Sequence, residues 1–184
     1  MPLSDPAERE LLHLRDIAVR GYRRADGLFD VEAELADTKT YGFDVGNRRV
    51  EPGDKLHNML MRMTVDEELT IVSCEATTEW GPFATCGGGA TTFGRLAGLQ
   101  IRAGFLREAN ARIGGVDGCT HIRELLQQMA TVAFQTTFVL RQRQKAAEVE
   151  ASRLVNSCYA YAADGEVVRR RWPALYTGPA TAAD

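Results

Sequence analysis

Residues 14–35 read "LRDIAVRGYRRADGLFDVEAEL", and this stretch decides the fold class. Near its centre stands the dipeptide Asp26-Gly27, which is a strong signal for a tight turn between two antiparallel strands. After the turn, residues 29–35 alternate apolar and acidic side chains, so the apolar ones share one face and the acidic ones the other. The stretch therefore predicts a β-hairpin with one face turned toward a core.

A second hairpin is predicted after residues 40–54, which are rich in glycine and proline and are expected to form a loop. Its strands are "KLHNMLMRMTV" (55–65) and "LTIVSCEAT" (69–77), with a turn near Asp66. On the first strand His57, Met59 and two further methionines fall on one face, while Arg62 falls on the other.

Helical spacing replaces alternation after the glycines at 87–89, which match no phosphate-binding loop. Apolar residues recur at helical intervals from Thr92, and Gly114 is expected to end this helix. A second helix is predicted from Thr120 to Lys145, with its core face formed by Ile122, Leu125, Met129, Val132 and Ala133.

The order of strands and helices predicts an α+β fold: an antiparallel sheet of about four or more strands, in two hairpins, packed against two long helices. We expect a single domain over 14–162, preceded by an N-terminal segment (1–13) and followed by a partly flexible tail (163–184). A weak strand is expected near residues 158–161. The hairpins and both helices are expected to share one continuous core.

Composition excludes several classes of protein. The net charge is −3 and the pI about 5.7, so no overall positive field favours nucleic acid or acidic lipid as a partner. No apolar run is long enough to cross a membrane, and the N-terminus contains acidic residues and no apolar stretch typical of a signal peptide. We therefore expect a cytoplasmic protein, with its four widely spaced cysteines as free thiols.

A polar stripe marks the second predicted helix. Its members step by three and four residues and so lie along one side: His121, Glu124, Gln128, Thr131 and Gln135. Neutral amides in a row fit the wall of a polar pocket, although an ordinary exposed helix face remains equally compatible. At the helix N-terminus, the dipole favours the neutral form of the His121 imidazole. His121 is thus a candidate base or metal ligand, or a residue that only hydrogen-bonds to a neighbouring loop.

His57 leaves similar alternatives open, because a histidine on an apolar strand face is often a core residue. His57 and His121 with a carboxylate such as Asp37 or Glu32 would suit a metal ion, but the sequence contains no established metal-ligand spacing. We therefore expect no metal and no organic cofactor. Arginines and acids on the strands, including Arg62, could equally form ion pairs without any chemical role.

Four motifs in order add a family resemblance: "RGYRRADGLFDVEAELADTK" (20–39), "LHNMLMRMTVD" (56–66), "GCTHIRELL" (118–126) and "ATVAFQT" (130–136). Together they resemble the bacterial family catalogued as domain of unknown function 2889, over about residues 15–135. The chain departs from the family pattern at Asn58, Phe105 and Tyr159, where the pattern has Asp, Trp and His. A role for position 58 or 159 as an acid or base is therefore not expected here.

The resemblance implies a small cofactor-independent lyase of aromatic catabolism, which releases the γ-carbinol of a lignin-derived aromatic dimer as formaldehyde. Such a reaction needs a base for a primary alcohol, groups that stabilise a phenolic oxygen, and a slot for aromatic rings. The predicted catalytic residues are His57, His121, Tyr22 and Lys39. The predicted substrate-binding residues are Arg24, Glu32, Asp37, Met59, Arg62, Glu124, Gln128 and Gln135. The slot is expected to be lined by Met59, Met61, Met63 and Phe134.

Two other functions remain open from the residues alone. The domain could be a non-catalytic module that binds a small molecule or a protein, or a metal-assisted hydrolase. The expected partner is a small aromatic substrate, and the sequence leaves open whether the protein is a monomer or a homo-oligomer.

Overall fold

The computed structural model describes residues 3–46, 48–144, 151 and 154–179. Its contacts divide the chain into two compact units, Met1–Thr137 and Phe138–Asp184. The predicted single domain of 14–162 therefore contains this boundary, which falls within the helix Thr120–Gln144. Each unit is described by itself below.

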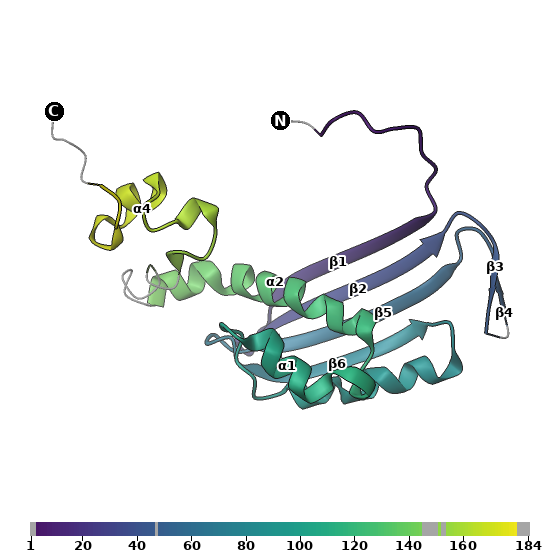
Figure 1. The fold of residues 1–184 in the computed structure, drawn as a ribbon. Helices are drawn as coiled ribbons and strands as arrows, with labels where there is room; N and C mark the ends of the chain where they lie inside the picture. Colours follow the sequence, from purple (N-terminus) through teal and green to yellow (C-terminus); the bar gives the residue numbers. More distant parts are fainter. Residues whose placement is uncertain (1–2, 47, 145–150, 152–153, 180–184) are drawn as a thin grey trace. The chain divides into compact units, whose positions relative to one another are not determined.

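A four-stranded antiparallel sheet forms the centre of the first unit (Figure 1). Its strands are β1 (His13–Arg23), β2 (Phe29–Lys39), β5 (Lys55–Val65) and β6 (Ile71–Trp80), in the order β1-β2-β5-β6. Both predicted hairpins are present. The first turns at Gly27, whose φ of 89° is a conformation that glycine adopts without strain.

A second, two-stranded sheet lies in the segment predicted to be a loop. It consists of β3 (Phe43–Val45) and β4 (Arg48–Val50). Strands of three residues are too short to show a convincing alternation, so the sequence pattern missed them.

The predicted helix between Thr92 and Gly114 is wrong in its extent. The chain instead forms a 3₁₀ helix, η1 (Ala84–Leu96), and then a separate short helix, α1 (Phe105–Ile113), followed by a 3₁₀ turn, η2 (Gly115–Asp117). Gly98 and Gly104 separate η1 from α1, and both have positive φ angles that a continuous helix cannot contain. The sheet is therefore covered by one long α-helix, by the short α1 and by η1, which packs against β6, and not by two long helices.

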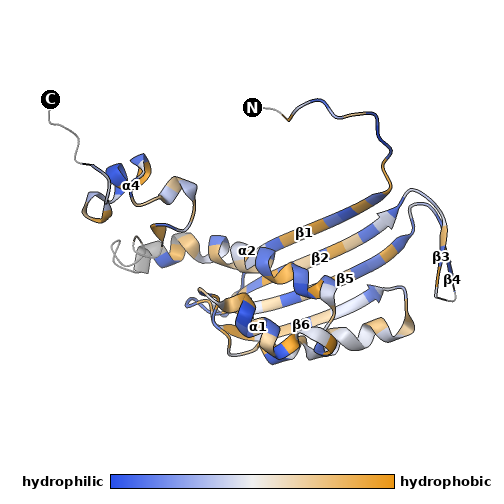
Figure 2. Cartoon of the chain, in the orientation of Figure 1, coloured by the Kyte–Doolittle hydropathy of each residue, from blue (hydrophilic) through white to orange (hydrophobic). Residues whose placement is uncertain are grey.

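The long helix is α2 (Thr120–Gln144), which begins where the sequence predicts. The predicted end at Lys145 lies outside the described residues. Four of its five predicted core residues are fully buried: Ile122, Leu125, Met129 and Ala133. They pack with the inner face of the sheet, which β2 and β5 supply through alternating apolar residues such as Leu35 and Met63 (Figure 2). The outer face carries charged residues.

The second unit contains η3 (Tyr159–Tyr161), α4 (Glu166–Arg171) and η4 (Pro173–Leu175). The weak strand predicted near residues 158–161 is wrong, because η3 occupies this position. The rings of Tyr161 and Trp172 lie 5.4 Å apart and Val168 is buried, so part of the predicted tail is folded. Among the described residues, no helix is both long and apolar enough to span a bilayer.

Gly21 allows α2 to approach β1 closely. A methyl group added at Gly21 would lie 1.8 Å from Oγ1 of Thr136, which donates a hydrogen bond to the carbonyl of Val132. We expect Gly21→Ala to reduce the free energy of unfolding by about 1–3 kcal/mol, as overpacking does, measured by urea denaturation.

Two controls separate this contact from a general effect of removing glycine. Gly94→Ala should change stability little, since its added carbon would meet only the Cys74 carbonyl oxygen at 3.7 Å. Adding Thr136→Ala to Gly21→Ala should recover part of the loss. If the double variant is less stable than Gly21→Ala by the full cost of Thr136→Ala alone, the two residues do not clash.

Candidate functional site

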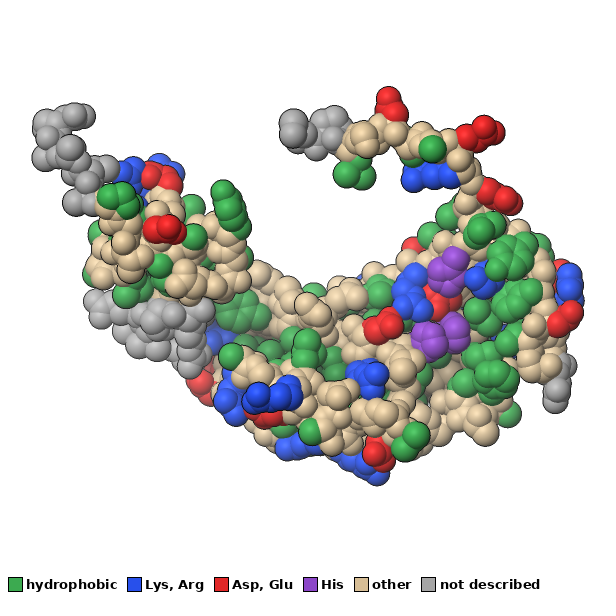
Figure 3. Space-filling model, viewed as in Figure 1, with side chains coloured by type: hydrophobic (Ala, Val, Ile, Leu, Met, Phe, Trp, Pro, Cys, Tyr) green, Lys and Arg blue, Asp and Glu red, His purple; other side chains and the backbone are tan. Residues whose placement is uncertain are grey.

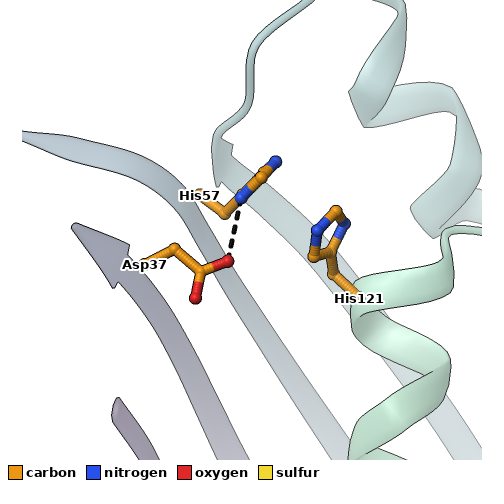
Figure 4. Close-up of side chains that lie close together, drawn as sticks. All are labelled: Asp37, His57 and His121. Carbon is orange, nitrogen blue, oxygen red and sulfur yellow. Dashed lines mark hydrogen bonds and ion pairs between the residues drawn. The ribbon is translucent and has the colours of Figure 1, made fainter. Parts of the chain in front are cut away.

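All three histidines of the chain come together around one buried carboxylate, that of Asp37, which is 1% exposed. The Nδ1 atom of His57 lies 2.9 Å from Oδ2 of Asp37, and Nε2 of His13 lies 3.3 Å from Oδ1. The His121 ring stacks beside that of His57 (Figure 4). We call Asp37, Arg15 and the three histidines the histidine cluster.

The pairing of three strands positions four members of the cluster. In the sheet register His13 lies opposite Lys39, Arg15 opposite Asp37, and Asp37 opposite His57. Residues opposite each other in a sheet project from the same face, here the inner face that the helices cover. His121, in the first turn of α2, completes the cluster from above this face.

Arg15 holds Asp37 in a two-pronged ion pair. Its Nε and Nη2 atoms each lie 2.7 Å from an oxygen of Asp37, and its Nη1 atom contacts the carboxylate of Glu124 on α2. Burial alone would raise the pKa of Asp37, but the hydrogen bonds and charge of Arg15, together with the hydrogen bond from His57, lower this pKa to about 2. Asp37 is therefore ionised at neutral pH.

His57 is neutral at pH 7. Burial lowers its pKa below the ordinary 6.5, and the nearby His121 lowers it further, whereas the hydrogen bond to Asp37 acts in the opposite direction. Because an ionised carboxylate can only accept, Nδ1 of His57 carries the proton and donates it to Asp37. This leaves Nε2 of His57 with a free lone pair, as a general base requires.

The rings of His57 and His121 are 3.9 Å apart between centroids and inclined by 31°. Protonating one ring therefore places a positive charge directly against the other. Sγ of Cys119 lies 3.9 Å from Nδ1 of His121, on the side of the helix start.

One set of ligand atoms in the described part of the chain could hold a metal ion. Asp37, His57 and His121 each offer an atom within 4.8 Å of the other two. However, both oxygens of Asp37 already accept hydrogen bonds from Arg15, and Oδ2 accepts another from His57. A divalent ion bound to Asp37 would have to compete with this guanidinium, so the geometry suits a general base better than a metal centre.

The structure brings five of the predicted site residues into or beside the cluster: His57, His121, Asp37, Lys39 and Glu124. The ammonium of Lys39 lies 3.5 Å from Nδ1 of His13. Met59, two residues along from His57, is fully buried in the core, as are Met61 and Met63. Their burial does not favour the expectation that the methionines line an open slot for aromatic rings.

Exposed aromatic side chains lie beside Lys39 instead. The rings of Tyr41 and Phe43 are 5.9 Å apart, and Nζ of Lys39 lies 5.3 Å from the first ring and 5.8 Å from the second. Figure 3 shows hydrophobic side chains gathered next to the histidines, toward the end of the sheet where β3 and β4 lie. We call Tyr41, Phe43 and Lys39 the aromatic shelf.

Other predicted residues lie away from the cluster. Glu32 and Arg62 face each other on the outer side of the sheet, where Arg62 also pairs with Glu75, each at 2.8 Å. Tyr22 lies on the same outer face, and Arg24 pairs with Asp26 and Asp30 near the hairpin turn. Gln128 is exposed on α2 beyond Glu124, and Gln135 is exposed two turns further along. Glu32, Arg62, Tyr22 and Arg24 therefore do not share one site with the histidines.

His13, Arg15 and the aromatic shelf residues Tyr41 and Phe43 were not predicted from the sequence. The sequence does contain a signal for His13 and Arg15. In a hairpin the residue numbers of paired positions have a constant sum, so a turn at residues 26–27 pairs position 15 with 37 and position 13 with 39. Tyr41 follows β2 outside any strand, and Phe43 begins the three-residue strand β3, so neither lies in a stretch long enough for a periodic signal.

The family model described as "Protein of unknown function (DUF2889)" matches residues 13–135. The chain belongs to this family. The matched range begins at His13 and includes every member of the histidine cluster, so the cluster lies wholly within the DUF2889 region. No curated protein and no solved structure matches the chain.

The Arg15–Asp37 pair should contribute measurably to the free energy of unfolding, and this contribution should depend on pH. A folded pKa of about 2 against an ordinary 3.8 corresponds to about 2 kcal/mol of stability above pH 4. Because this pKa is depressed, that stability is lost as the pH falls from 4 through 2. We expect Arg15→Met to cost about 2 kcal/mol at pH 7 and less near pH 2, measured by urea unfolding at both pH values.

Arg62→Met is the matched control, since Arg62 forms exposed ion pairs on the outer face. It should cost under about 1 kcal/mol. If both variants lose equally little at pH 7, Arg15 does not hold Asp37 as the geometry indicates.

Proposed function

We propose that this DUF2889 protein is a cytoplasmic, cofactor-independent carbon–carbon lyase that releases formaldehyde from the γ-carbinol of a lignin-derived aromatic dimer. The observation that carries the proposal is the His57–Asp37 pair: an oriented, neutral imidazole whose free nitrogen faces outward from a buried carboxylate. The family resemblance supplies the reaction, and the aromatic shelf beside the cluster fits the substrate class.

In this mechanism Nε2 of His57 takes the proton of the γ-hydroxyl group. The oxygen lone pair forms the carbonyl of formaldehyde as the bond between the γ-carbon and its neighbour breaks. The released electron pair moves into the conjugated system of a quinone methide and ends on its phenolic oxygen. This quinone methide forms beforehand, when the ionised phenol of the substrate expels the oxygen substituent of its α-carbon, which takes a proton from solvent and leaves as water or an alcohol. Lys39, whose Nζ atom lies 5.3 Å from the Tyr41 ring, can stabilise this phenolate. Asp37 stabilises the imidazolium that forms on His57.

The experiment is an assay of formaldehyde release from a panel of aromatic dimers that carry a free γ-hydroxyl group. We expect one formaldehyde per cleaved substrate, and none from analogues whose γ-hydroxyl is methylated, since these offer no proton to the base. Absence of release from the whole panel would contradict the lyase proposal.

The pH dependence of this activity is a further prediction. An imidazole acts as a general base only when it is neutral, and burial holds the pKa of His57 below the ordinary 6.5. We therefore expect the titration of His57 to leave kcat/KM unchanged above about pH 6.5. Below this value kcat/KM should fall as the pH drops through the pKa of His57. An acid limb centred well above pH 6.5 would contradict the assignment of His57 as the base.

A metal-assisted hydrolase is the second candidate, because Asp37, His57 and His121 have ligand atoms within 4.8 Å of one another. Titration with Zn²⁺, followed by calorimetry and by assay with hydrolysable esters and amides, addresses it directly. Stoichiometric binding that creates hydrolase activity would favour this candidate over the lyase.

A further inference from the structure

A groove runs between β1 and α2, directly beside the histidine cluster. It has a volume of about 450 Å³, and we call it the β1–α2 groove. Ile17 and Val19 of β1 and Val132 of α2 supply apolar side chains to it. Gln127, Gln128 and Thr131 supply neutral polar groups.

The groove begins at the cluster. Glu124 lines it, and the carboxylate of Glu124 pairs with the same Arg15 that holds Asp37. Ile17 follows Arg15 by two residues on the same strand face, a distance of about 7 Å along the strand. His57 and the groove therefore flank the same Arg15, and a ligand that spans both would pass over this side chain.

Beyond the groove, α2 comes close to β1 at Gly21, where an added methyl group would lie 1.8 Å from Oγ1 of Thr136. The sequence positions on β1 and α2 advance together from Arg15 and Glu124 to this approach, so the groove lies between the Arg15–Glu124 pair and Gly21. Its size falls within the range of small-molecule sites, about 300–1,000 Å³.

The chemistry of the lining selects a class of ligand. Apolar side chains favour a flat hydrophobic group, while amides and a hydroxyl can both donate and accept hydrogen bonds without adding charge. The only charged group among the lining residues, Glu124, is already paired with Arg15. An aromatic ring with neutral oxygen substituents, such as methoxyl or hydroxyl groups, fits this combination.

We propose that the β1–α2 groove binds the second aromatic ring of the dimer, while the ring that bears the developing phenolate lies at the aromatic shelf and the γ-carbinol lies at His57. The inference rests on the proposed function for its substrate, but the groove itself can be tested without turnover. It makes Gln128 and Val132 specificity residues that favour two-ring over single-ring substrates.

The kinetic test uses Gln128→Trp, which places a large side chain at the rim of the groove. We expect KM for a two-ring substrate to rise about tenfold or more, a loss of about 1.4 kcal/mol of binding. Turnover of a single-ring arylpropanoid with the same γ-carbinol should not change. Ala111→Trp, on the exposed side of α1, is the matched control and should alter neither substrate. An unchanged KM for the two-ring substrate in Gln128→Trp would overturn the inference.

The binding test uses 2-methoxyphenol as a probe and methyl NMR of the wild-type protein. We expect shifts at the methyl groups of Ile17, Val19 and Val132, and their loss in Gln128→Trp. Such shifts from a protein that releases no formaldehyde would uphold the groove as an aromatic site while the lyase proposal fails. A lyase whose probe shifts occur elsewhere would overturn the groove and leave the lyase proposal in place.

Discussion

Replacing His57 with glutamine should lower formaldehyde release by about 10²–10⁴-fold, the usual contribution of a positioned general base. Glutamine keeps a polar side chain of similar size but cannot take up a proton. Because His57 is mostly buried and donates to Asp37, the fold should be checked by circular dichroism and urea unfolding. The loss should appear mainly in kcat, since the imidazole acts in proton transfer.

Two companion variants sharpen this prediction. His121→Gln should also reduce turnover if the stacked ring contributes to the base, and comparing the two variants shows which histidine carries the larger role. Tyr22→Phe should leave turnover unchanged, because Tyr22 lies on the outer face of the sheet, away from the cluster. Near-normal turnover in both histidine variants would mean that the acid–base assignment is wrong.

Replacing Met129 with alanine should reduce the free energy of unfolding by about 2–5 kcal/mol, as expected for truncating a large, fully buried side chain. Met129 lies on the core face of α2, and the cavity left behind would lie inside the first unit, where the sheet and helices pack. Urea denaturation followed by circular dichroism measures the change.

Gln128→Ala is the matched control for Met129→Ala, since the neighbouring Gln128 is exposed on the same helix. It should change stability by less than about 0.5 kcal/mol. A loss below this value in Met129→Ala as well would mean that α2 does not pack through the face described.

The hairpins could be predicted because their signals are local: an Asp-Gly turn and strict alternation along each strand. The helical region could not, because apolar spacing continues past Gly98 and Gly104, whose positive φ angles break the helix. Glycine permits such angles without requiring them, so the sequence alone does not show where a break occurs.

The candidate site was predictable in part for the same reason. Alternation already separates odd positions such as 37 and 57 from even positions such as 22, 32 and 62, and the structure places these two sets on opposite faces of the sheet. The family resemblance grouped residues from both faces of the sheet, because a sequence motif is contiguous and successive residues of a strand point to opposite faces. The stacking of His121 on His57 depends on how α2 crosses the sheet, which no local pattern encodes.

The histidine cluster draws its members from segments far apart in the chain: Arg15 and Asp37 are 22 positions apart, Asp37 and His57 are 20 apart, and His121 follows His57 by 64. No hairpin or helix alone contains the base, its carboxylate partner and the second ring. The histidine cluster therefore forms only in the complete tertiary structure. It is absent from every partly folded form that lacks β1, β2, β5 or α2. During refolding, recovery of activity should lag behind recovery of helical circular dichroism wherever the two can be resolved, so that activity serves as the chain's own reporter of complete folding.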